Sequence, residues 1–212
     1  MQQKFKSVLV LAPHTDDGEL GAGGFISKLI QEGASVTYVA FSIAEDSVPE
    51  HLPRDILKVE VKAATKVLGI KEDNLIVFNY PVRKLNFARQ EILEDLIKIK
   101  RNNSFDLILM PSLKDIHQDH TTIAQEGLRA FKNTTILGYE LIWNNLSFDT
   151  TCFVKLSKKN VEDKFLSLQC YESQIGRSYM SHEFIFSLAK VRGVQIGAEY
   201  AESFEVLRWV IN

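Results

Sequence analysis

Two patterns of apolar and polar residues alternate along the first two thirds of the chain. Short continuous apolar runs predict strands that are buried on both faces of a sheet. The predicted strands are Ser7–Ala12, Ser35–Ser42, Leu75–Phe78, Phe105–Met110 and Thr135–Tyr139. Segments with apolar residues three and four positions apart predict helices between them. The predicted helices are Gly21–Gln31, Arg54–Leu68, Ala88–Lys100 and Thr121–Phe131.

Regular alternation of strands and helices implies right-handed crossovers and a parallel sheet. The last third is mixed, with one predicted strand, Thr151–Leu156, and two predicted helices, Val161–Tyr171 and Glu183–Val191. No linker, repeat or low-complexity tract divides the chain, so we expect one domain over residues 1–212. The predicted fold class is α/β, a Rossmann-like sandwich with a mostly parallel sheet flanked by helices.

Composition and charge narrow the classes of partner. The chain is 45% apolar and has a net charge of −2 without a basic block, which argues against a nucleic-acid partner. No apolar run approaches the roughly 20 residues of a membrane span. The two cysteines, Cys152 and Cys170, are too few for a disulfide scaffold and predict buried free thiols in a cytoplasmic protein.

An acidic motif, HTDDGELG, follows the first predicted strand and contains His14, Asp16, Asp17 and Glu19. Ligands of doubly wound sheets bind at the carboxyl ends of the strands. Three carboxylates would repel a phosphate and the GxGxxG pattern is absent, which argues against a nucleotide-binding oxidoreductase. A divalent metal would relieve the repulsion between these acids. The alternative is a solvated acidic turn in which Asp16 or Asp17 caps the next helix.

A second motif, HQDH, follows the strand Phe105–Met110 and supplies His117, Asp119 and His120. Here too the alternative is a capping Asp119 with exposed histidines around it. Together the motifs offer two histidines and a carboxylate for a metal, with a spare carboxylate and histidine, which is the composition of a catalytic zinc site. The same set can hold iron(II) in oxygenases. The spare acid–base pair, Asp16 and His117, favours hydrolysis.

With these motifs the chain resembles the LmbE-like, or PIG-L, family of zinc-dependent N-acyl deacetylases, which carry (A/P)HPDDE after a first strand and HxDH later. Three further segments are similar to the family and extend the resemblance over nearly the whole chain: Glu60–Gly69, Lys164–Gln174 and Arg192–Val206. The chain departs from the family pattern at Thr15, which replaces a proline, and at Gly18, which is inserted before Glu19. Leu57 stands where many relatives have an arginine.

The resemblance implies a zinc-dependent hydrolase that removes an acetyl group from an N-acetylglucosamine-type glycoside or sugar nucleotide. It implies that the zinc ligands are His14, Asp17 and His120. Asp16 would be the general base for a zinc-bound water, and His117 would stabilise the oxyanion, with Asp119 orienting it. A metal-binding protein of the same fold without turnover is the alternative.

Basic residues near the strand ends are candidates for binding the sugar substrate: Arg54, Arg83 and Arg192, with Arg192 the first choice. The aromatic segment Trp143–Phe153 is a candidate interface of a homo-oligomer.

Overall fold

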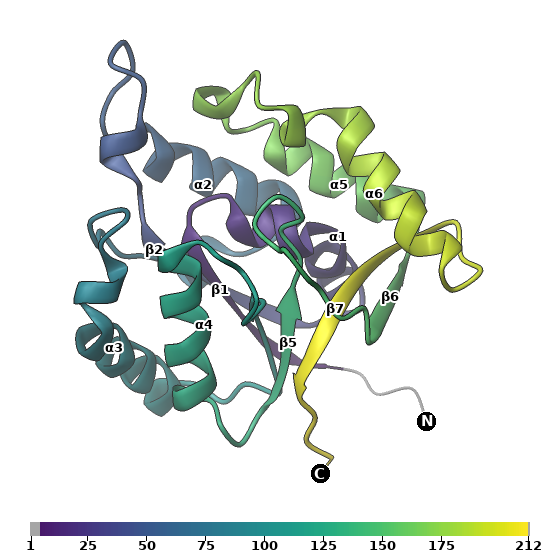
Figure 1. The fold of residues 1–212 in the computed structure, drawn as a ribbon, viewed down its shortest axis with the longest axis horizontal. Coiled ribbons are helices and arrows are strands. Elements are labelled where there is room, and N and C mark those ends of the chain that lie inside the picture. The colour runs from purple at the N-terminus through teal and green to yellow at the C-terminus, as the bar shows by residue number, and fades with distance from the viewer. Residues whose placement is uncertain (1–4, 212) are drawn as a thin grey trace.

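The computed structural model describes residues 5–211 and contains a seven-stranded sheet in the order β3-β2-β1-β4-β5-β7-β6 (Figure 1). The strands are β1 (Ser7–His14), β2 (Ser35–Ser42), β3 (Leu75–Val77), β4 (Leu107–Pro111), β5 (Thr135–Tyr139), β6 (Cys152–Leu156) and β7 (Tyr200–Arg208). Strands β1 to β5 pair in parallel, and β7 pairs antiparallel with both β5 and β6. The predicted α/β class with a mostly parallel sheet is confirmed.

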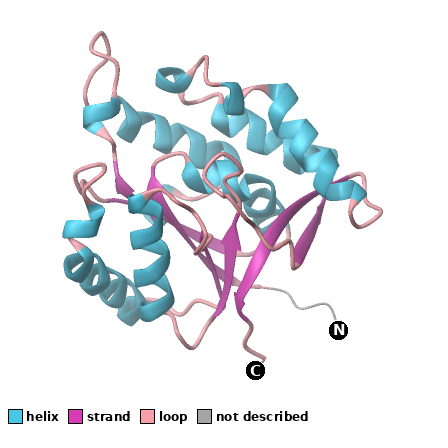
Figure 2. Ribbon diagram, viewed as in Figure 1, coloured by secondary structure: helices cyan, strands magenta, loops and turns pink. Residues whose placement is uncertain are grey.

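Helices cover both faces of the sheet (Figure 2). They are α1 (Asp17–Gln31), α2 (Ile56–Leu68), α3 (Arg89–Asn102), α4 (Gln118–Ala130), α5 (Lys158–Leu168) and α6 (His182–Val194). One core cluster joins α1, α2, α5 and α6 to the sheet, and a second joins α3 and α4 to the opposite face. Along β1, Val8 and Val10 face the first cluster and Leu9 and Leu11 the second. A strand buried in this way has no polar face, so its sequence is a continuous apolar run.

Helix α1 begins very close to the sheet because glycines occupy its contact positions. A Cβ atom at Gly21 would lie 2.2 Å from the ring of Tyr139, and one at Gly18 would lie 2.5 Å from the ring of Tyr38. The Gly18 N–H also donates a hydrogen bond to the Tyr38 hydroxyl (3.1 Å). The inserted Gly18 therefore lets the first turn of α1 pack directly against the sheet.

The two helices that follow the motifs begin earlier than their apolar spacing predicts. Helix α1 starts at Asp17 instead of Gly21, and α4 starts at Gln118 instead of Thr121. Only Leu20 among the added residues is apolar, so these first turns carry little of the apolar pattern from which the helices were predicted. As a result, both motifs extend into the first turns of helices, where anionic groups are favoured.

Strand β7 is absent from the prediction because its interior carries buried acids. The Glu202 carboxylate accepts hydrogen bonds from Lys164 Nζ (2.8 Å) and from the backbone N–H groups of Gly24 (3.0 Å) and Phe25 (2.7 Å). These partners come from α5 and α1, far away in the sequence. These partners compensate the cost of burying the carboxylate, so Glu202 is tolerated inside β7. In the sequence alone, the same acid makes the segment look too polar for a buried strand.

Two other expectations concern the chain as a whole. Cys152 and Cys170 are free thiols, as predicted, but both are half-buried. Within residues 5–211, no helix has the length and apolar character needed to cross a membrane.

Candidate metal centre

Both motifs meet where the strand order of the sheet reverses. β1 and β4 are neighbours, while β2 lies on the other side of β1 and β5 on the other side of β4. His14 is the last residue of β1, and Asp17 is the first residue of α1. His117 and His120 lie at the start of α4, just after β4. The crevice at such a reversal is the usual ligand site of an open α/β sheet.

Three donor atoms form a nearly equilateral triangle at this point. His14 Nδ1 lies 3.1 Å from Asp17 Oδ2, His120 Nε2 lies 3.2 Å from the same oxygen, and the two nitrogens are 3.2 Å apart. Tetrahedral zinc, with bonds of about 2.0–2.1 Å, separates its ligand atoms by about 3.3 Å. The spacing of these three donor atoms therefore fits one face of a tetrahedral metal site.

The far nitrogen of each histidine is held by a buried carboxylate. His14 Nε2 lies 3.0 Å from Asp119 Oδ2, and His120 Nδ1 lies 2.7 Å from Asp115 Oδ2. Such partners select the tautomer and orientation in which the other nitrogen faces a metal. The Asp119 carboxylate thus contacts His14, whereas the sequence predicts that it orients His117. Asp115 is missing from the predicted site, because an acid five residues before a histidine is a weak signal in a loop.

The remaining histidine, His117, is held in a different way. Its Nδ1 accepts a hydrogen bond from the Asp119 N–H (3.2 Å), so the ring caps α4. Asp119 itself does not cap the helix. His14, His117 and His120 could offer a metal three nitrogens within 4.8 Å of one another. However, a neutral ring that accepts at Nδ1 carries its proton on Nε2, which leaves an N–H donor there instead of a ligand lone pair.

The charges of the triangle indicate that it needs protons or a cation. Burial alone would raise the pKa of Asp17, but the charges and hydrogen bonds of His120 and His14 hold it well below its ordinary value. Burial alone would lower the pKa of both histidines. Asp17, with Asp119 at His14 and Asp115 at His120, instead raises the pKa to about 9 for His14 and about 10 for His120. A metal ion would take the place of these protons.

Asp16 is the N-cap residue of α1, yet its side chain makes no capping hydrogen bond. Burial, reinforced by the negative charge of Asp17, raises the pKa of the Asp16 carboxyl to about 6. Among residues 5–211, no other side chain donates a hydrogen bond to this carboxylate, and Asp16 is half-buried beside the triangle. It is therefore a free carboxylate next to the three donor atoms.

A cleft of about 310 Å³ opens over these residues. Its floor contains His14, Asp16, Asp17, His117 and His120. Its other lining residues are Thr15, Leu20, Ala44, Ser47, Leu57, Val82, Arg83, Trp143, Asn144, Gln174, Arg177 and Tyr179. Trp143 stacks on Tyr179 with ring centroids 4.2 Å apart and an interplanar angle of 15°. The cleft can thus hold a small molecule between a polar floor and partly aromatic walls.

The family model described as GlcNAc-PI de-N-acetylase, PIG-L, matches residues 9–131, which is more than half of the chain. The chain belongs to the PIG-L family. A relative from Escherichia coli strain K12, the uncharacterized deacetylase YaiS, is 26% identical over 176 residues, which span 80% of this chain and 92% of that protein.

Two solved structures show that the PIG-L chain shares its fold with enzymes of different reactions. N,N'-diacetylchitobiose deacetylase from Pyrococcus horikoshii has a TM-score of 0.79 and 24% identity, covering 96% of this chain and 84% of that one. GalB, the 4-carboxy-2-hydroxymuconate hydratase of Pseudomonas putida KT2440, has a TM-score of 0.79 and 21% identity, covering 98% of each chain. Because one fold carries two reactions, the activity has to be argued from the residues of the site.

Of the three arginines that the sequence suggests as substrate-binding residues in this PIG-L chain, the structure places one at the cleft and two elsewhere. Arg83 lines the cleft, together with Arg177, which the sequence analysis does not include. Arg54 is exposed outside the cleft, where its Nη1 donates to the Glu45 carbonyl (3.2 Å). The Arg192 guanidinium forms an ion pair with Glu140. Nothing in the sequence distinguishes Arg177 from an ordinary exposed arginine.

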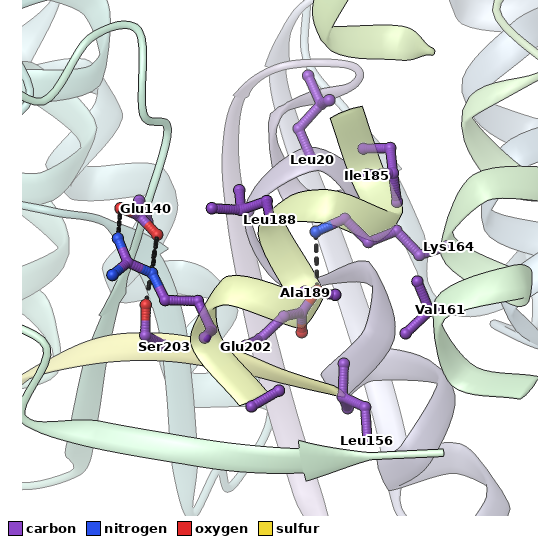
Figure 3. Close-up of a pocket in the computed structure, with 13 residues that line it drawn as sticks. Leu20, Glu140, Leu156, Val161, Lys164, Ile185, Leu188, Ala189, Glu202 and Ser203 are labelled. Carbon is purple, nitrogen blue, oxygen red and sulfur yellow. Dashed lines mark hydrogen bonds and ion pairs between the residues drawn. The ribbon is translucent and has the colours of Figure 1, made fainter. Parts of the chain in front are cut away.

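Arg192 and Glu140 belong to a second, smaller cavity between α1, α5, α6 and β7 (Figure 3). The ion pair of Lys164 with Glu202 lies in the same cavity, and the Ser203 hydroxyl reaches the Glu140 carboxylate (3.3 Å). Leu20, Ile185 and Ala189 also line it. Because these charges are paired with one another between packed helices, we interpret them as contacts that hold the elements of the fold together.

Glu19, where the chain departs from the family pattern, is fully buried and does not line the cleft. Its carboxyl contacts the hydroxyls of Tyr38 and Tyr171, the latter at 3.0 Å. Both hydroxyls also reach the Thr15 carbonyl, at 2.9 Å and 2.7 Å. Burial raises the pKa of Glu19 to about 8. Glu19 therefore anchors the backbone between His14 and Asp16 from behind the site.

Replacing Asp115 by Asn should weaken the binding of a divalent metal, with zinc as the probe, by about 10- to 100-fold, because loss of an outer carboxylate commonly has that effect. The amide oxygen can still accept from His120 Nδ1–H, but the amide is neutral and can also present its NH₂ group, so it favours the tautomer in which Nε2 binds metal less than a carboxylate does. Competition with a chromophoric chelator measures the affinity, and Asp73→Asn, an exposed acid, is the matched control. Equal zinc affinities of Asp115→Asn and the unmodified protein would contradict this.

Proposed function

We propose that this protein is a metal-dependent N-deacetylase that releases acetate from an N-acetylated sugar of the N-acetylglucosamine type. The observation that carries the proposal is the triangle of His14 Nδ1, Asp17 Oδ2 and His120 Nε2 on the floor of a cleft. A free carboxylate and an N–H donor, on Asp16 and His117, line the same floor. The family description names a de-N-acetylase of a GlcNAc compound, and the Pyrococcus structure is a diacetylchitobiose deacetylase.

We propose zinc as the metal, with His14, Asp17 and His120 as its ligands. Three protein ligands leave one position open, as in catalytic zinc sites and unlike closed structural ones. When bound, the metal would polarise the acetyl carbonyl and lower the pKa of its water to about 7. Iron(II) accepts the same two-histidine, one-carboxylate set. Metal analysis of protein prepared without oxygen is therefore part of the test.

Asp16 is proposed to move the proton in this reaction. Its carboxylate is held beside the triangle by the peptide link to Asp17 and has no competing side-chain donor among the residues that the structure describes. It accepts a proton as water adds to the acetyl carbon, and it returns that proton to the amine as the C–N bond breaks. The products are acetate and the free amino sugar, so one water is consumed for each amide.

His117 is proposed to stabilise the oxyanion that forms on the acetyl oxygen. The Asp119 N–H occupies Nδ1, so the neutral ring presents Nε2–H toward the cleft. Burial, with the neighbouring His120 and His14, lowers the pKa of His117, which favours this neutral form. An N–H donor placed before the reaction starts stabilises a developing oxyanion by about 3 kcal/mol.

Acetate release from a panel of N-acetyl sugars tests the proposed function. N-acetylglucosamine, its methyl glycoside, its 1-phosphate and N,N'-diacetylchitobiose are incubated with metal-free, zinc-loaded and iron(II)-loaded protein. We expect stoichiometric acetate and amine from at least one sugar with zinc, and none without metal. Zinc binding without acetate release from any sugar would favour a binding protein over an enzyme. Activity with iron(II) alone would overturn the choice of zinc.

A further inference from the structure

The turn that carries Asp16 is held from behind by buried side chains of three separate segments. Tyr38 comes from β2, Glu19 from α1, and Tyr171 from the loop after α5. The hydroxyls of Tyr38 and Tyr171 lie 2.9 Å and 2.7 Å from the Thr15 carbonyl oxygen, and both also contact the Glu19 carboxyl. We call Glu19, Tyr38 and Tyr171 the rear cage. All three are at most 1% exposed, and none of them lines the cleft.

The rear cage fixes the peptide that leads into Asp16. The C=O of Thr15 and the N–H of Asp16 belong to one planar unit, so a hydroxyl that holds the oxygen also fixes the direction of the Asp16 backbone. On the other side, the Asp16 carbonyl accepts the first hydrogen bond of α1, from the Leu20 N–H (3.0 Å). The Gly18 N–H donates to the Tyr38 hydroxyl (3.1 Å), which ties the start of α1 to the same cage. Both peptide units that flank Asp16 are therefore held.

The Asp16 carboxylate depends on this backbone for its position. It makes no capping hydrogen bond, and within residues 5–211 no other side chain donates to it. The two histidines of the donor triangle, in contrast, have anchors of their own on the other side of the site. His14 contacts Asp119, and His120 contacts Asp115. Loosening the turn from behind should therefore displace the Asp16 carboxylate more than it displaces the metal ligands.

Glu19 determines how the two hydroxyls of the rear cage share their protons. A tyrosine hydroxyl has one proton, which can face either the Thr15 carbonyl or the Glu19 carboxyl. The Thr15 carbonyl oxygen can only accept, so it is held when a hydroxyl turns its proton toward it. The second partner of that hydroxyl is then the Glu19 carboxyl. An apolar side chain at position 19 would leave both buried hydroxyls without this partner.

We propose that Glu19, Tyr38 and Tyr171 are positioning residues for the proton transfer that Asp16 carries out. The inference rests on the proposed deacetylase function. The three residues act through the peptide between Thr15 and Asp16, because none of them lines the cleft where the substrate binds. Misplacing a reacting group by about 1 Å can lower a rate by about 10²-fold. The rear cage should therefore contribute to kcat and leave KM and metal affinity unchanged.

Tyr171→Phe tests the rear cage, because it removes one hydroxyl and keeps the ring. We expect kcat of the zinc-loaded protein to fall by about 10- to 100-fold, with KM and zinc affinity unchanged. Tyr139→Phe is the matched control, since the buried Tyr139 hydroxyl also donates to a backbone carbonyl, that of Leu11 (2.9 Å). It should lose a similar amount of thermal stability and keep its kcat. Equal kcat in the two variants, or a loss confined to KM or to zinc affinity, would overturn the proposal.

Two variants of Glu19 test the acid of the rear cage. Glu19→Gln keeps an oxygen that accepts from one hydroxyl and an amide N–H that donates to the other, whose own proton can then face the Thr15 carbonyl. It should retain most of the kcat. Glu19→Leu has neither group and should lose at least as much kcat as Tyr171→Phe, with circular dichroism confirming that it is folded. Unchanged kcat in Glu19→Leu would remove Glu19 from the positioning role.

Hydrogen exchange of the metal-free proteins separates the rear cage from the activity. The Gly18 amide donates to the Tyr38 hydroxyl, so its exchange reports whether the turn is held. We expect faster exchange over residues 15–18 in Tyr171→Phe than in the unmodified protein or in Tyr139→Phe. Faster exchange, without hydrolysis of any sugar by the unmodified protein, would retain the cage around Asp16 and reject the deacetylase. Hydrolysis with unchanged exchange and kcat in Tyr171→Phe would do the reverse. Neither hydrolysis nor faster exchange would reject both.

Discussion

Replacing Asp16 by Asn should lower kcat for deacetylation by a factor of about 10² to 10⁴ and leave the zinc content unchanged. Asn has nearly the same shape as Asp, so the turn between His14 and Asp17 can keep its geometry. The Asp16 carboxylate is not one of the three atoms of the triangle. The amide cannot accept the proton that leaves the attacking water, so the reaction loses its base while the metal site persists.

Acetate release and zinc content by mass spectrometry are measured on the same Asp16→Asn preparation. Asp73→Asn, an exposed acid, is the matched control and should retain full activity. Full activity of Asp16→Asn would remove Asp16 from the role of base. Loss of zinc would instead make Asp16 a ligand and change the assignment of Asp17.

Replacing His120 by Ala should abolish stoichiometric zinc binding and, with it, all turnover. His120 Nε2 is one corner of the donor triangle, and the ring is buried, with 2% exposure. Its loss should reduce affinity by more than the roughly 10- to 100-fold expected for loss of an outer partner such as Asp115. It also leaves the buried Asp115 Oδ2 without its hydrogen-bond partner, which costs about 1–3 kcal/mol of stability, whereas Asp17 Oδ2 keeps its contacts with His14.

Zinc retained after dialysis against a chelator measures the first effect of His120→Ala, and thermal unfolding of the metal-free proteins measures the second. His51→Ala removes an exposed histidine outside the cleft and should change neither quantity. Stoichiometric zinc in His120→Ala would contradict the ligand assignment. It would point to His117, which lies within 4.8 Å of the other donors, as a ligand.

Much of the architecture could be predicted because it depends on neighbouring residues. The strand Ser35–Ser42 was predicted with its observed bounds, and the helix Arg54–Leu68 begins only two residues later in the structure, at Ile56. A buried strand and an amphipathic helix each repeat their apolar residues with a characteristic local period. Strand β7 could not be predicted, because Glu202 is acceptable in its interior only through Lys164 and two N–H groups from other elements.

The site, like the fold, has a part that could be predicted from the sequence and a part that could not. The residues for metal chemistry are adjacent in two short motifs, and the carboxyl ends of parallel strands share one edge, so His14, Asp17 and His120 could be expected to meet. Their orientation could not be predicted. His14 depends on Asp119, 105 positions away, and His120 depends on Asp115.

The sequence by itself determined that this protein is a mostly parallel α/β chain with two motifs of metal-ligand type, because local spacing specifies both. The tertiary structure decided which carboxylate holds which histidine, that Arg192 forms an ion pair with Glu140, and that Arg83 and Arg177 line the cleft. The physical reason is that a charged side chain takes its function from the groups around it. For these residues, those groups come from distant parts of the chain.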